Sequence, residues 1–330
     1  MMERNVTSLP TLGVDLGGTK VKTALVDVNG QILSAHKYPT HPEKGSDKII
    51  TDILTSIDEC LDKARQEAKV LGIGIAGQVD FKGVVHYAPN LKWRNVPLKE
   101  KLEEKLGLPV IVVNDVRAAT LGEWRYGSGK GVDDLIVLFV GTGIGGGVIS
   151  GGKMIVGCSN TGGELGHITI VYGGRSCRCP NMGCLEAYAG GWAIAERAQE
   201  AVRSDPEAWQ YLTSLAGSIE NITAATVGHA YREGDQKAYQ LVKETGQYLA
   251  AGAVSIVNAF NPCLFVLGGG VIKGLPELIQ IVENFTRKKA LESALKNLKF
   301  VKAALGGDAG VIGAAALAQN KIYGFHKLSE

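Results

Sequence analysis

The chain carries almost no excess of charge of either sign. Of its 330 residues, 35 are lysine or arginine and 33 are aspartate or glutamate, which gives a formal net charge of +2. A strong basic field is what draws nucleic acids and anionic membranes to a protein, so this balance predicts neither kind of partner. Long apolar runs are also missing, and no stretch approaches the length that a membrane-spanning helix needs.

An apolar leader is missing as well. The first ten residues, MMERNVTSLP, are polar and contain no hydrophobic segment of the kind that a secretory signal needs. We therefore expect a cytoplasmic protein with reduced thiols. A hydrophobic share of 45% is that of a globular protein, and the length suggests two domains. Glycine is abundant at 44 residues, so backbone that approaches a phosphate closely is a hypothesis to pursue.

Cysteine is scarce, but half of the six cysteines lie within eight positions. Cys177, Cys179 and Cys184 follow His167, which lies ten residues before the first thiol. Three thiols and one imidazole make a complete tetrahedral zinc set, whereas three thiols cannot all pair as disulfides. Such a set leaves no position open for water, so we predict a structural zinc site.

Two carboxylates bracket this cysteine segment. Glu164 lies three residues before His167, and Glu186 lies two residues after Cys184. A zinc-fixed loop would aim Glu164, His167 and Glu186 at a common target. The isolated cysteines are predicted to be small buried hydrophobic residues: Cys60, Cys158 and Cys263.

Two glycine-rich turns each join one predicted strand to another. The first, DLGGTK at 15–20, follows a strand at 11–16 and precedes one at 21–28; the second, GTGIGGG at 141–147, follows a strand at 134–140. Because these glycines do not open a helix, they exclude the Walker and Rossmann loops. We interpret both turns as phosphate-binding loops, in which Asp15 would face a metal ion. The alternative is a pair of plain tight hairpins.

Asn114 and Asp115 follow a short apolar strand at 109–113 and precede a predicted helix at 116–126. The carboxyl end of a strand is where α/β proteins place their sites. A carboxylate there suits a general base for a hydroxyl group, although an N-cap of the helix is the commoner use of such an aspartate.

The remaining pattern predicts an alternation of strands and helices. Helices are expected at residues 46–68, 96–106, 185–204, 223–233 and 236–260, and a last one from about 309 to 319. Strands are expected at 69–76, 263–267 and 300–305, with a turn at 77–80 and a loop at 90–93. After the strand at 263–267, bare backbone at Gly268–Gly270 could carry a flat ring such as adenine, or could simply be the turn that precedes a helix.

Taken together, these motifs resemble the ROK family of sugar kinases and related repressors. The resemblance runs from Gly13 to about Gln319. It is carried by DLGGTK, by Asn114–Asp115, by GTGIGGG, by GELGH at 163–167, by CRCPNMGCLE at 177–186 and by GGGV at 268–271. Here Pro180 follows the second cysteine where the family usually has glycine, and Ala76 precedes Gly77 where the family usually has proline.

The resemblance implies an α/β protein with an actin-like ATPase (ribonuclease-H-like) fold in two lobes, with a cleft between them. The smaller lobe would comprise residues 1–115 and 309–330. The larger lobe would comprise residues 116–308, with the zinc-binding loop at 167–184. Family members usually form homodimers or homotetramers.

The resemblance also implies ATP-dependent phosphorylation of a hexose, with Mg2+ accompanying ATP. Asp115 would be the general base. The positions that match sugar-binding residues are Gly77, Asn114, Asp115, Glu164, His167 and Glu186. Those that match nucleotide-binding residues are Asp15, Gly17, Gly18, Thr19, Lys20, Thr142, Gly143, Gly268, Gly269 and Gly270. His167, Cys177, Cys179 and Cys184 match the zinc ligands.

GELGH and the NLKW segment at 90–93 look most like the glucose-directed members, so we predict a glucokinase. The same pattern leaves open a kinase for N-acetylmannosamine, mannose, fructose or allose. A sugar-responsive transcriptional repressor is less expected, because only about a dozen residues precede the first glycine turn, too few for a DNA-reading domain.

Overall fold

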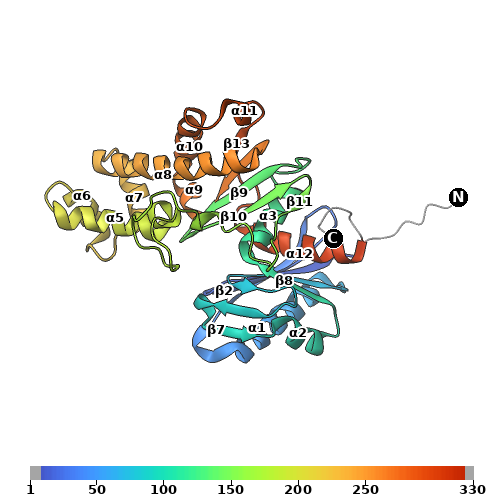
Figure 1. Cartoon of the computed structure of the whole chain (residues 1–330). Coiled ribbons are helices and arrows are strands. Elements are labelled where there is room, and N and C mark those ends of the chain that lie inside the picture. Colours follow the sequence, from blue (N-terminus) through green and yellow to red (C-terminus); the bar gives the residue numbers. More distant parts are fainter. Residues whose placement is uncertain (1–8, 324–330) are drawn as a thin grey trace. The chain divides into compact units, whose positions relative to one another are not determined.

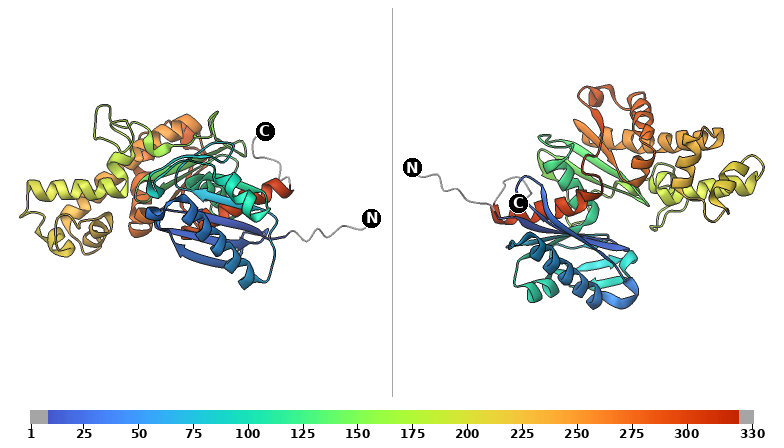
Figure 2. Two further views of the ribbon diagram at one scale, coloured as in Figure 1. Left: turned by 90° about the horizontal axis from the view of Figure 1, so that it is seen from below. Right: turned by 180° about the vertical axis from the view of Figure 1, so that it is seen from behind.

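The structure is a computed structural model that describes residues 9–323 and divides into two compact units. Unit 1 comprises the described residues up to Asp133, residues Gly151–Gly162, and the residues from Ala304 on. Unit 2 comprises Asp134–Ser150 and Gly163–Ala303. Figures 1 and 2 show the elements of each unit. The predicted lobe boundaries at 115/116 and 308/309 stay a prediction, and residues 1–8 and 324–330 of the predicted smaller lobe lie outside the described residues.

Unit 1 is built on a sheet whose strands lie in the order β3-β2-β1-β4-β8. The first three strands are antiparallel, and β4 and β8 continue the sheet in parallel with β1. Their bounds are β1 (Thr11–Leu16), β2 (Lys20–Val26), β3 (Ile32–Pro39), β4 (Leu71–Ile75) and β8 (Val110–Asn114).

A second, three-stranded sheet of unit 1 corrects the sequence analysis. It consists of β5 (Gln78–Val79), β6 (Val85–Ala88) and β7 (Trp93–Val96), where we expected a turn and a loop. Strands of two to four residues are too short to show the alternation by which a sequence reveals a strand.

Helices cover both faces of the main sheet of unit 1 (Figure 1). They are α1 (Gly45–Ala64), α2 (Leu98–Leu106), α3 (Asp115–Tyr126) and α12 (Ala309–Tyr323), with short 3-10 turns at η1 (Pro42–Lys44), η2 (Pro89–Leu91) and η4 (Gly306–Asp308). Leu12 and Val14 share one apolar cluster with Ile53 of α1. Gly13 points to the other face, where an added Cβ would lie 2.1 Å from the carbonyl oxygen of Val311 in α12. Only glycine therefore lets α12 pack directly on β1.

Unit 2 repeats the plan of the unit 1 sheet. Its strands lie in the order β10-β9-β12-β13. The strands β9 and β10 are antiparallel, whereas β12 is parallel to both β9 and β13. Their bounds are β9 (Leu135–Val140), β10 (Ile144–Ser150), β12 (Leu264–Gly268) and β13 (Lys299–Lys302); β11 (Lys153–Met154) is a further short strand of the chain. In both units a hairpin is thus followed by parallel strands. The last strand ends at Lys302, before the Leu305 that we expected.

The helices of unit 2 form its apolar core with the sheet. They are α4 (Glu186–Ala189), α5 (Gly191–Ser204), α6 (Gln210–Ala216), α7 (Ala224–Arg232), α8 (Gln236–Phe260), α9 (Gly270–Gly274), α10 (Glu277–Arg287) and α11 (Glu292–Leu295), with a 3-10 turn at η3 (Leu165–His167). The single helix expected at 185–204 is two helices, because Gly190 takes an extended conformation (φ −65°, ψ 153°) between α4 and α5.

Two of the three isolated cysteines also differ from expectation. Cys60 is buried in the core of unit 1, whereas Cys158 and Cys263 are exposed. Cys263 lies just outside β12, which begins at Leu264. Among the residues that the structure describes, no helix is long and apolar enough to cross a membrane.

Candidate functional site

The first glycine turn joins β1 to β2 and is closed by a hydrogen bond from the Gly17 amide to the Lys20 carbonyl (3.0 Å). A second bond, from the Thr40 amide to the Thr19 carbonyl (3.0 Å), holds the turn from outside. Gly18 lies so close to Asn90 that an added Cβ would approach its Cβ to 2.7 Å. The turn therefore presents its backbone tightly, while the side chains of Thr19 and Lys20 are exposed.

Charged side chains gather beside this first turn. Asp15 lies opposite Lys22 in the β1–β2 register, and Lys22 forms an ion pair with Asp308. Burial raises the pKa of Asp15, while Lys20 and Lys22 pull this pKa down again. A carboxylate that has lost part of its hydration gains from a nearby cation. Gly310 leaves space for the Asp15 carboxylate, since a Cβ at this position would lie 2.8 Å from the Asp15 carboxyl carbon.

Asn114, and not Asp115, is the N-cap of α3. The Asn114 side-chain oxygen accepts hydrogen bonds from the amides of Val116 (3.0 Å) and Arg117 (3.2 Å). Its side-chain nitrogen donates to the carbonyl of Gly77 (3.3 Å), which brings two of the predicted sugar-binding positions together. Asp115 is the first residue of α3 and is partly exposed.

The second glycine turn, between β9 and β10, is held by the start of α5. The amides of Gly191 and Trp192 donate to the carbonyls of Gly141 (2.9 Å) and Thr142 (3.0 Å). The first amides of a helix have no partner within the helix, so here the turn supplies their acceptors. Gly191 must be glycine, because a Cβ would lie 2.6 Å from the Gly141 carbonyl oxygen.

The Glu186 carboxylate completes the support of this second turn. One oxygen accepts a hydrogen bond from the Ile144 amide (2.7 Å), and the other accepts one from the indole Nε1 of Trp192 (3.1 Å). Gly143 packs against the same carboxylate, since an added Cβ would lie 2.3 Å from Glu186 Oε2. Each carboxylate oxygen has a second lone pair, so these bonds leave capacity for a further donor.

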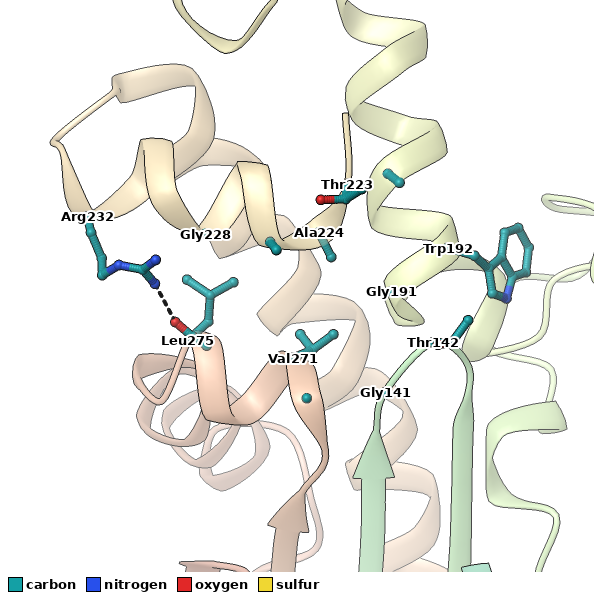
Figure 3. A pocket seen from close by; sticks show the side chains of 14 residues that line it. Gly141, Thr142, Gly191, Trp192, Thr223, Ala224, Gly228, Arg232, Val271 and Leu275 are labelled. Atoms are coloured by element: carbon teal, nitrogen blue, oxygen red, sulfur yellow. Dashed lines mark hydrogen bonds between the residues drawn. The ribbon is translucent and has the colours of Figure 1, made fainter. Parts of the chain in front are cut away.

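A pocket of about 520 Å3 opens beside the second turn, within unit 2 (Figure 3). Gly141, Thr142 and Trp192 line one side. The other sides come from α7 and α9 and include Gly228, Arg232, Gly270, Val271 and Leu275. The lining is largely small and apolar, which suits a flat aromatic ring, and it meets the glycine turn at one end.

The predicted nucleotide-binding glycines take different places at this pocket. Gly270 lines it, whereas Gly268 is buried at the end of β12. Gly269 has a positive φ of 92°, and a Cβ there would lie 2.3 Å from the Val140 carbonyl oxygen. The contribution of α7, together with its N-cap Thr223, was not predicted from the sequence. The only signal there was the run of small residues Thr223–Ala225 at a helix start.

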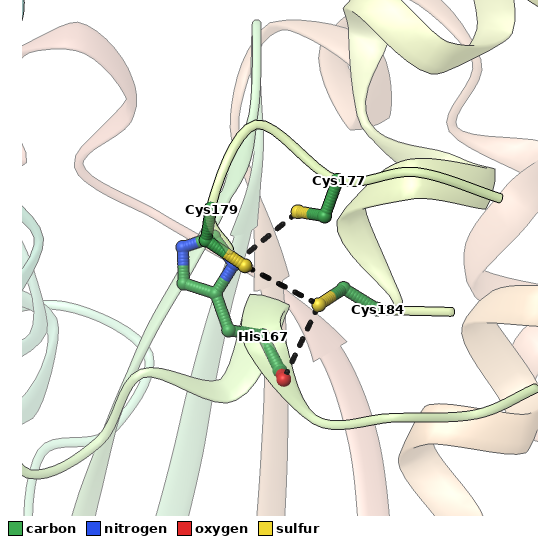
Figure 4. Close-up of side chains that lie close together, drawn as sticks. All are labelled: His167, Cys177, Cys179 and Cys184. Atoms are coloured by element: carbon green, nitrogen blue, oxygen red, sulfur yellow. Dashed lines mark hydrogen bonds between the residues drawn. The ribbon is translucent and has the colours of Figure 1, made fainter. Parts of the chain in front are cut away.

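The four predicted zinc ligands come together in unit 2 (Figure 4). Their ligand atoms all lie within 4.8 Å of one another. Cys177 Sγ lies 3.6 Å from His167 Nδ1, and Cys179 Sγ lies 3.6 Å from Cys184 Sγ. Around a tetrahedral zinc ion, with bonds of about 2.0–2.3 Å, neighbouring ligand atoms are about 3.5–3.8 Å apart. The donor set and its spacing therefore fit zinc.

The thiols of this cluster differ in their proton affinity. Burial raises the pKa of Cys184 to about 12 and also raises that of Cys177, whereas backbone and thiol hydrogen bonds lower the pKa of Cys179. Without a metal ion, the cluster would thus keep most of its thiol protons at neutral pH. Metal binding would release them, as it does at thiolate sites in general.

The predicted sugar-binding residues are divided between the units. Gly77, Asn114 and Asp115 belong to unit 1, and the others, Glu164, His167 and Glu186, belong to unit 2. Glu164 is exposed at the start of η3, and its carbonyl accepts a hydrogen bond from the amide of His167 (3.0 Å). His167 turns Nδ1 toward the thiols, so Nε2 lies on the side of the ring away from Nδ1.

Known proteins are similar to this chain in sequence and in fold over nearly its whole length. A glucokinase of Streptomyces coelicolor is 37% identical over 312 residues, which cover 94% of this chain and 97% of that protein. The crystal structure of a ROK family glucokinase from Streptomyces griseus, in complex with glucose and AMPPNP, matches with a TM-score of 0.82 at 37% identity, covering 94% of this chain and 99% of that one. A ROK hexokinase from Thermus thermophilus matches with a TM-score of 0.83 at 32% identity, covering 95% and 99%.

These structures confirm the predicted actin-like ATPase fold, whose two ribonuclease-H-like halves account for the strand order found twice in this chain. The model of the ROK family matches residues 11–321. The chain therefore belongs to the ROK family.

Proposed function

We propose that this protein is a glucokinase, which transfers the terminal phosphoryl group of ATP to D-glucose and yields glucose 6-phosphate and ADP. The observation that carries the proposal is the full-length match to a glucokinase solved with glucose and AMPPNP, at 37% identity. The mostly apolar pocket beside the second glycine turn supports it, because its size and lining suit a nucleoside.

We assign the role of general base to Asp115. Phosphoryl transfer depends mainly on positioning and on charge neutralisation, so the base need only accept the hydroxyl proton as the new bond forms. A carboxylate with an ordinary proton affinity suffices for that. Support comes from its position: Asp115 is the first residue of α3, directly after the carboxyl end of β8, where α/β proteins place their sites.

We assign Gly77, Asn114, Glu164, His167 and Glu186 to the hydroxyl groups of the sugar. Carboxylate oxygens suit such groups, because each accepts two hydrogen bonds in fixed directions. We assign the phosphates of ATP to the backbone of Gly17, Gly18, Thr142 and Gly143 and to the side chains of Thr19 and Lys20. Gly268–Gly270 would support the nucleoside, as the pocket lining at Gly270 suggests.

Magnesium would accompany ATP, and we propose that the Asp15 carboxylate faces this ion. When bound, the ion supplies positive charge to the phosphate oxygens. The charged neighbourhood of Asp15 supports this assignment, since burial of its carboxylate is offset by a cation.

We further propose that His167, Cys177, Cys179 and Cys184 bind one structural zinc ion. The spacing of the four ligand atoms supports this assignment. Zinc on Nδ1 would set the orientation of the His167 ring, and with it the direction of Nε2 toward a sugar hydroxyl. The cytoplasmic location, a place at the start of glycolysis and a homodimeric or homotetrameric state rest on the sequence and remain predictions.

The sugar is tested by steady-state assays with ATP and Mg2+ on D-glucose, N-acetylmannosamine, mannose, fructose and allose. We expect the highest kcat/KM on glucose. Robust turnover of another sugar without turnover of glucose would replace glucose in the proposal. Absence of turnover on all five, together with sequence-specific DNA binding, would support the repressor alternative instead.

A further inference from the structure

We propose that Arg178 and Trp192 transmit the order of the cysteine loop to the nucleotide site, so that this loop supports nucleotide binding as well as the sugar-directed residues. The inference rests on the proposed function, because it takes the pocket beside the second glycine turn as the nucleotide site. All the residues that carry it belong to unit 2.

Arg178 lies between two of the zinc ligands, Cys177 and Cys179. Its guanidinium carbon lies 4.5 Å from the centre of the Trp192 ring, within the range of a cation–π contact. A metal ion on both flanking thiols would restrain the backbone on either side of Arg178. Arg178 is exposed, so packing its side chain on one ring costs conformational entropy. A backbone that is already fixed leaves less entropy to be lost when this contact forms.

Trp192 lines the nucleotide pocket and makes two hydrogen bonds there, one to the glycine turn and one to the carboxylate that supports the turn. Its backbone amide donates to the Thr142 carbonyl (3.0 Å), and its indole Nε1 donates to Glu186 (3.1 Å). Figure 3 shows the indole next to Thr142. The orientation of this ring therefore decides whether the Glu186 bond is made.

Glu186 completes the connection to the phosphate-binding backbone. Its second oxygen accepts a hydrogen bond from the Ile144 amide (2.7 Å), and Gly143 packs against the carboxylate. The contacts thus run without a gap from the cysteine loop through Arg178, Trp192 and Glu186 to the turn at Gly143. Such a series preorganises the turn, and preorganisation lowers the entropy that nucleotide binding must overcome.

The same loop offers a matched control. Arg175 lies two residues before Cys177, and its guanidinium forms two bonds of 2.7 Å to the Glu200 carboxylate. Arg175 and Arg178 thus carry the same charge in the same loop, and Arg178 alone of the two lies directly between two thiols. Of these two arginines, Arg178 contacts the Trp192 ring, whereas Arg175 is bonded to Glu200.

The test measures ADP binding with Mg2+ by calorimetry, and metal content by elemental analysis, on the full-length protein. We expect Arg178→Ala to weaken ADP binding about 3- to 5-fold, as the loss of one partly exposed cation–π contact implies. Arg178→Lys should recover part of this loss, Arg175→Ala should bind ADP like the wild type, and all three variants should retain zinc. In turnover, Arg178→Ala should raise the KM for ATP and leave kcat unchanged.

A double-substitution cycle tests the route. In a Trp192→Leu background, which removes the ring, Arg178→Ala should have no further effect on ADP binding. An undiminished effect there, wild-type affinity in Arg178→Ala, or loss of zinc from Arg178→Ala would each overturn the inference. A wild-type protein that binds no ADP would instead overturn the proposed function, so the two failures are distinguishable.

Discussion

The glycine turn between β1 and β2 lies among charged side chains, whereas the turn between β9 and β10 lies against helix amides, one carboxylate and an apolar pocket. Both turns join antiparallel strands that begin a sheet of the same strand order. Asp15, Lys20, Lys22 and Asp308 are near the first turn. The second turn is held by the amides of α5 and by Glu186.

We infer from this difference that one backbone device has two proposed uses in this chain. In the proposed function the first turn would add charge to the site, and unit 1 also carries Asp115, the proposed base. The second turn would instead contribute a fixed backbone position, because its glycines pack closely against neighbouring groups. We therefore expect a change at Asp115 in unit 1 to affect mainly the chemical step, and changes at the second turn and at the metal ligands in unit 2 to affect binding and metal content.

The largest effect is expected from Asp115→Ala. Loss of a general base lowers kcat by about 10²- to 10⁴-fold. Because Asp115 neither lines the pocket of about 520 Å3 nor belongs to the residues that we assign to the nucleotide, ADP affinity should stay near the wild-type value. Coupled assays of glucose 6-phosphate formation and calorimetry with ADP measure the two quantities. Wild-type turnover in this variant would remove Asp115 as the base.

Cys177→Ser should cause the next largest change, in unit 2. Loss of one of four ligands should lower the zinc content from about one ion per chain to almost none and weaken glucose binding through the His167 orientation. Elemental analysis and glucose titration measure both.

Cys263→Ser is the matched control for the metal site. Cys263 is exposed and is not a member of the His167 cluster. The zinc content of the Cys263→Ser protein should therefore equal that of the wild type. A wild-type protein purified without any zinc would contradict the structural role of the metal.

A pair of glycine substitutions probes the two turns directly. Gly143→Ala would drive a Cβ to 2.3 Å from Glu186 Oε2, whereas Gly17→Ala would place its Cβ no closer than 3.4 Å to the Lys20 carbonyl oxygen. Overpacking of this kind costs about 1–3 kcal/mol, which is a factor of about 5–150 in affinity. We expect Gly143→Ala to weaken ADP binding by such a factor and Gly17→Ala to weaken it far less. Equal losses would show that the turns do not differ in packing.

The smallest expected effect concerns Asp15 in the nucleotide-free protein. Burial raises its pKa in the folded state above the unfolded value of about 3.9, so stability falls as pH rises from that value through the folded-state pKa. Asp15→Asn removes this loss. At pH 7 the variant should be slightly more stable than the wild type, because Lys20 and Lys22 offset part of the effect of burial on the carboxylate.

Thermal melts between pH 4 and pH 7 measure this difference in stability. The melting temperatures of the wild type and of Asp15→Asn should converge as the pH falls toward 4. Asp58→Asn, at an exposed position of α1, is the control and should change little. A variant less stable than the wild type at pH 7 would show that the attraction of Lys20 and Lys22 outweighs burial at Asp15.

Much of the fold was predictable where neighbouring residues carry the signal. The strand β1 was predicted at its observed bounds from a short apolar run that ends at the glycine turn, and the helix α8 from its long amphipathic pattern. The short strands β5 and β7 were not, since two to four residues show no period. The break at Gly190 was also missed, because it depends on the packing of the following residues against Gly141 and Thr142.

The candidate site divides in the same way. The His167 cluster was predictable because its four ligands lie within a short stretch, so spacing alone limits how they can meet. The choice between Asn114 and Asp115 as N-cap was not, since both residue types cap helices equally well. Cys263 was expected to be buried, but its position just before β12 places it at the surface.

By itself, the sequence determined which residues are available for chemistry: the two glycine turns, the carboxylates beside them and the metal-ligand set. These motifs are local, and the backbone conformations that they require follow from the residue types. The tertiary structure alone decided that α7, distant in sequence, lines the pocket beside Gly141, and that Glu186 supports the turn at Gly143. Contacts of this kind depend on how helices pack across a shared core, and no spacing along the chain encodes such packing.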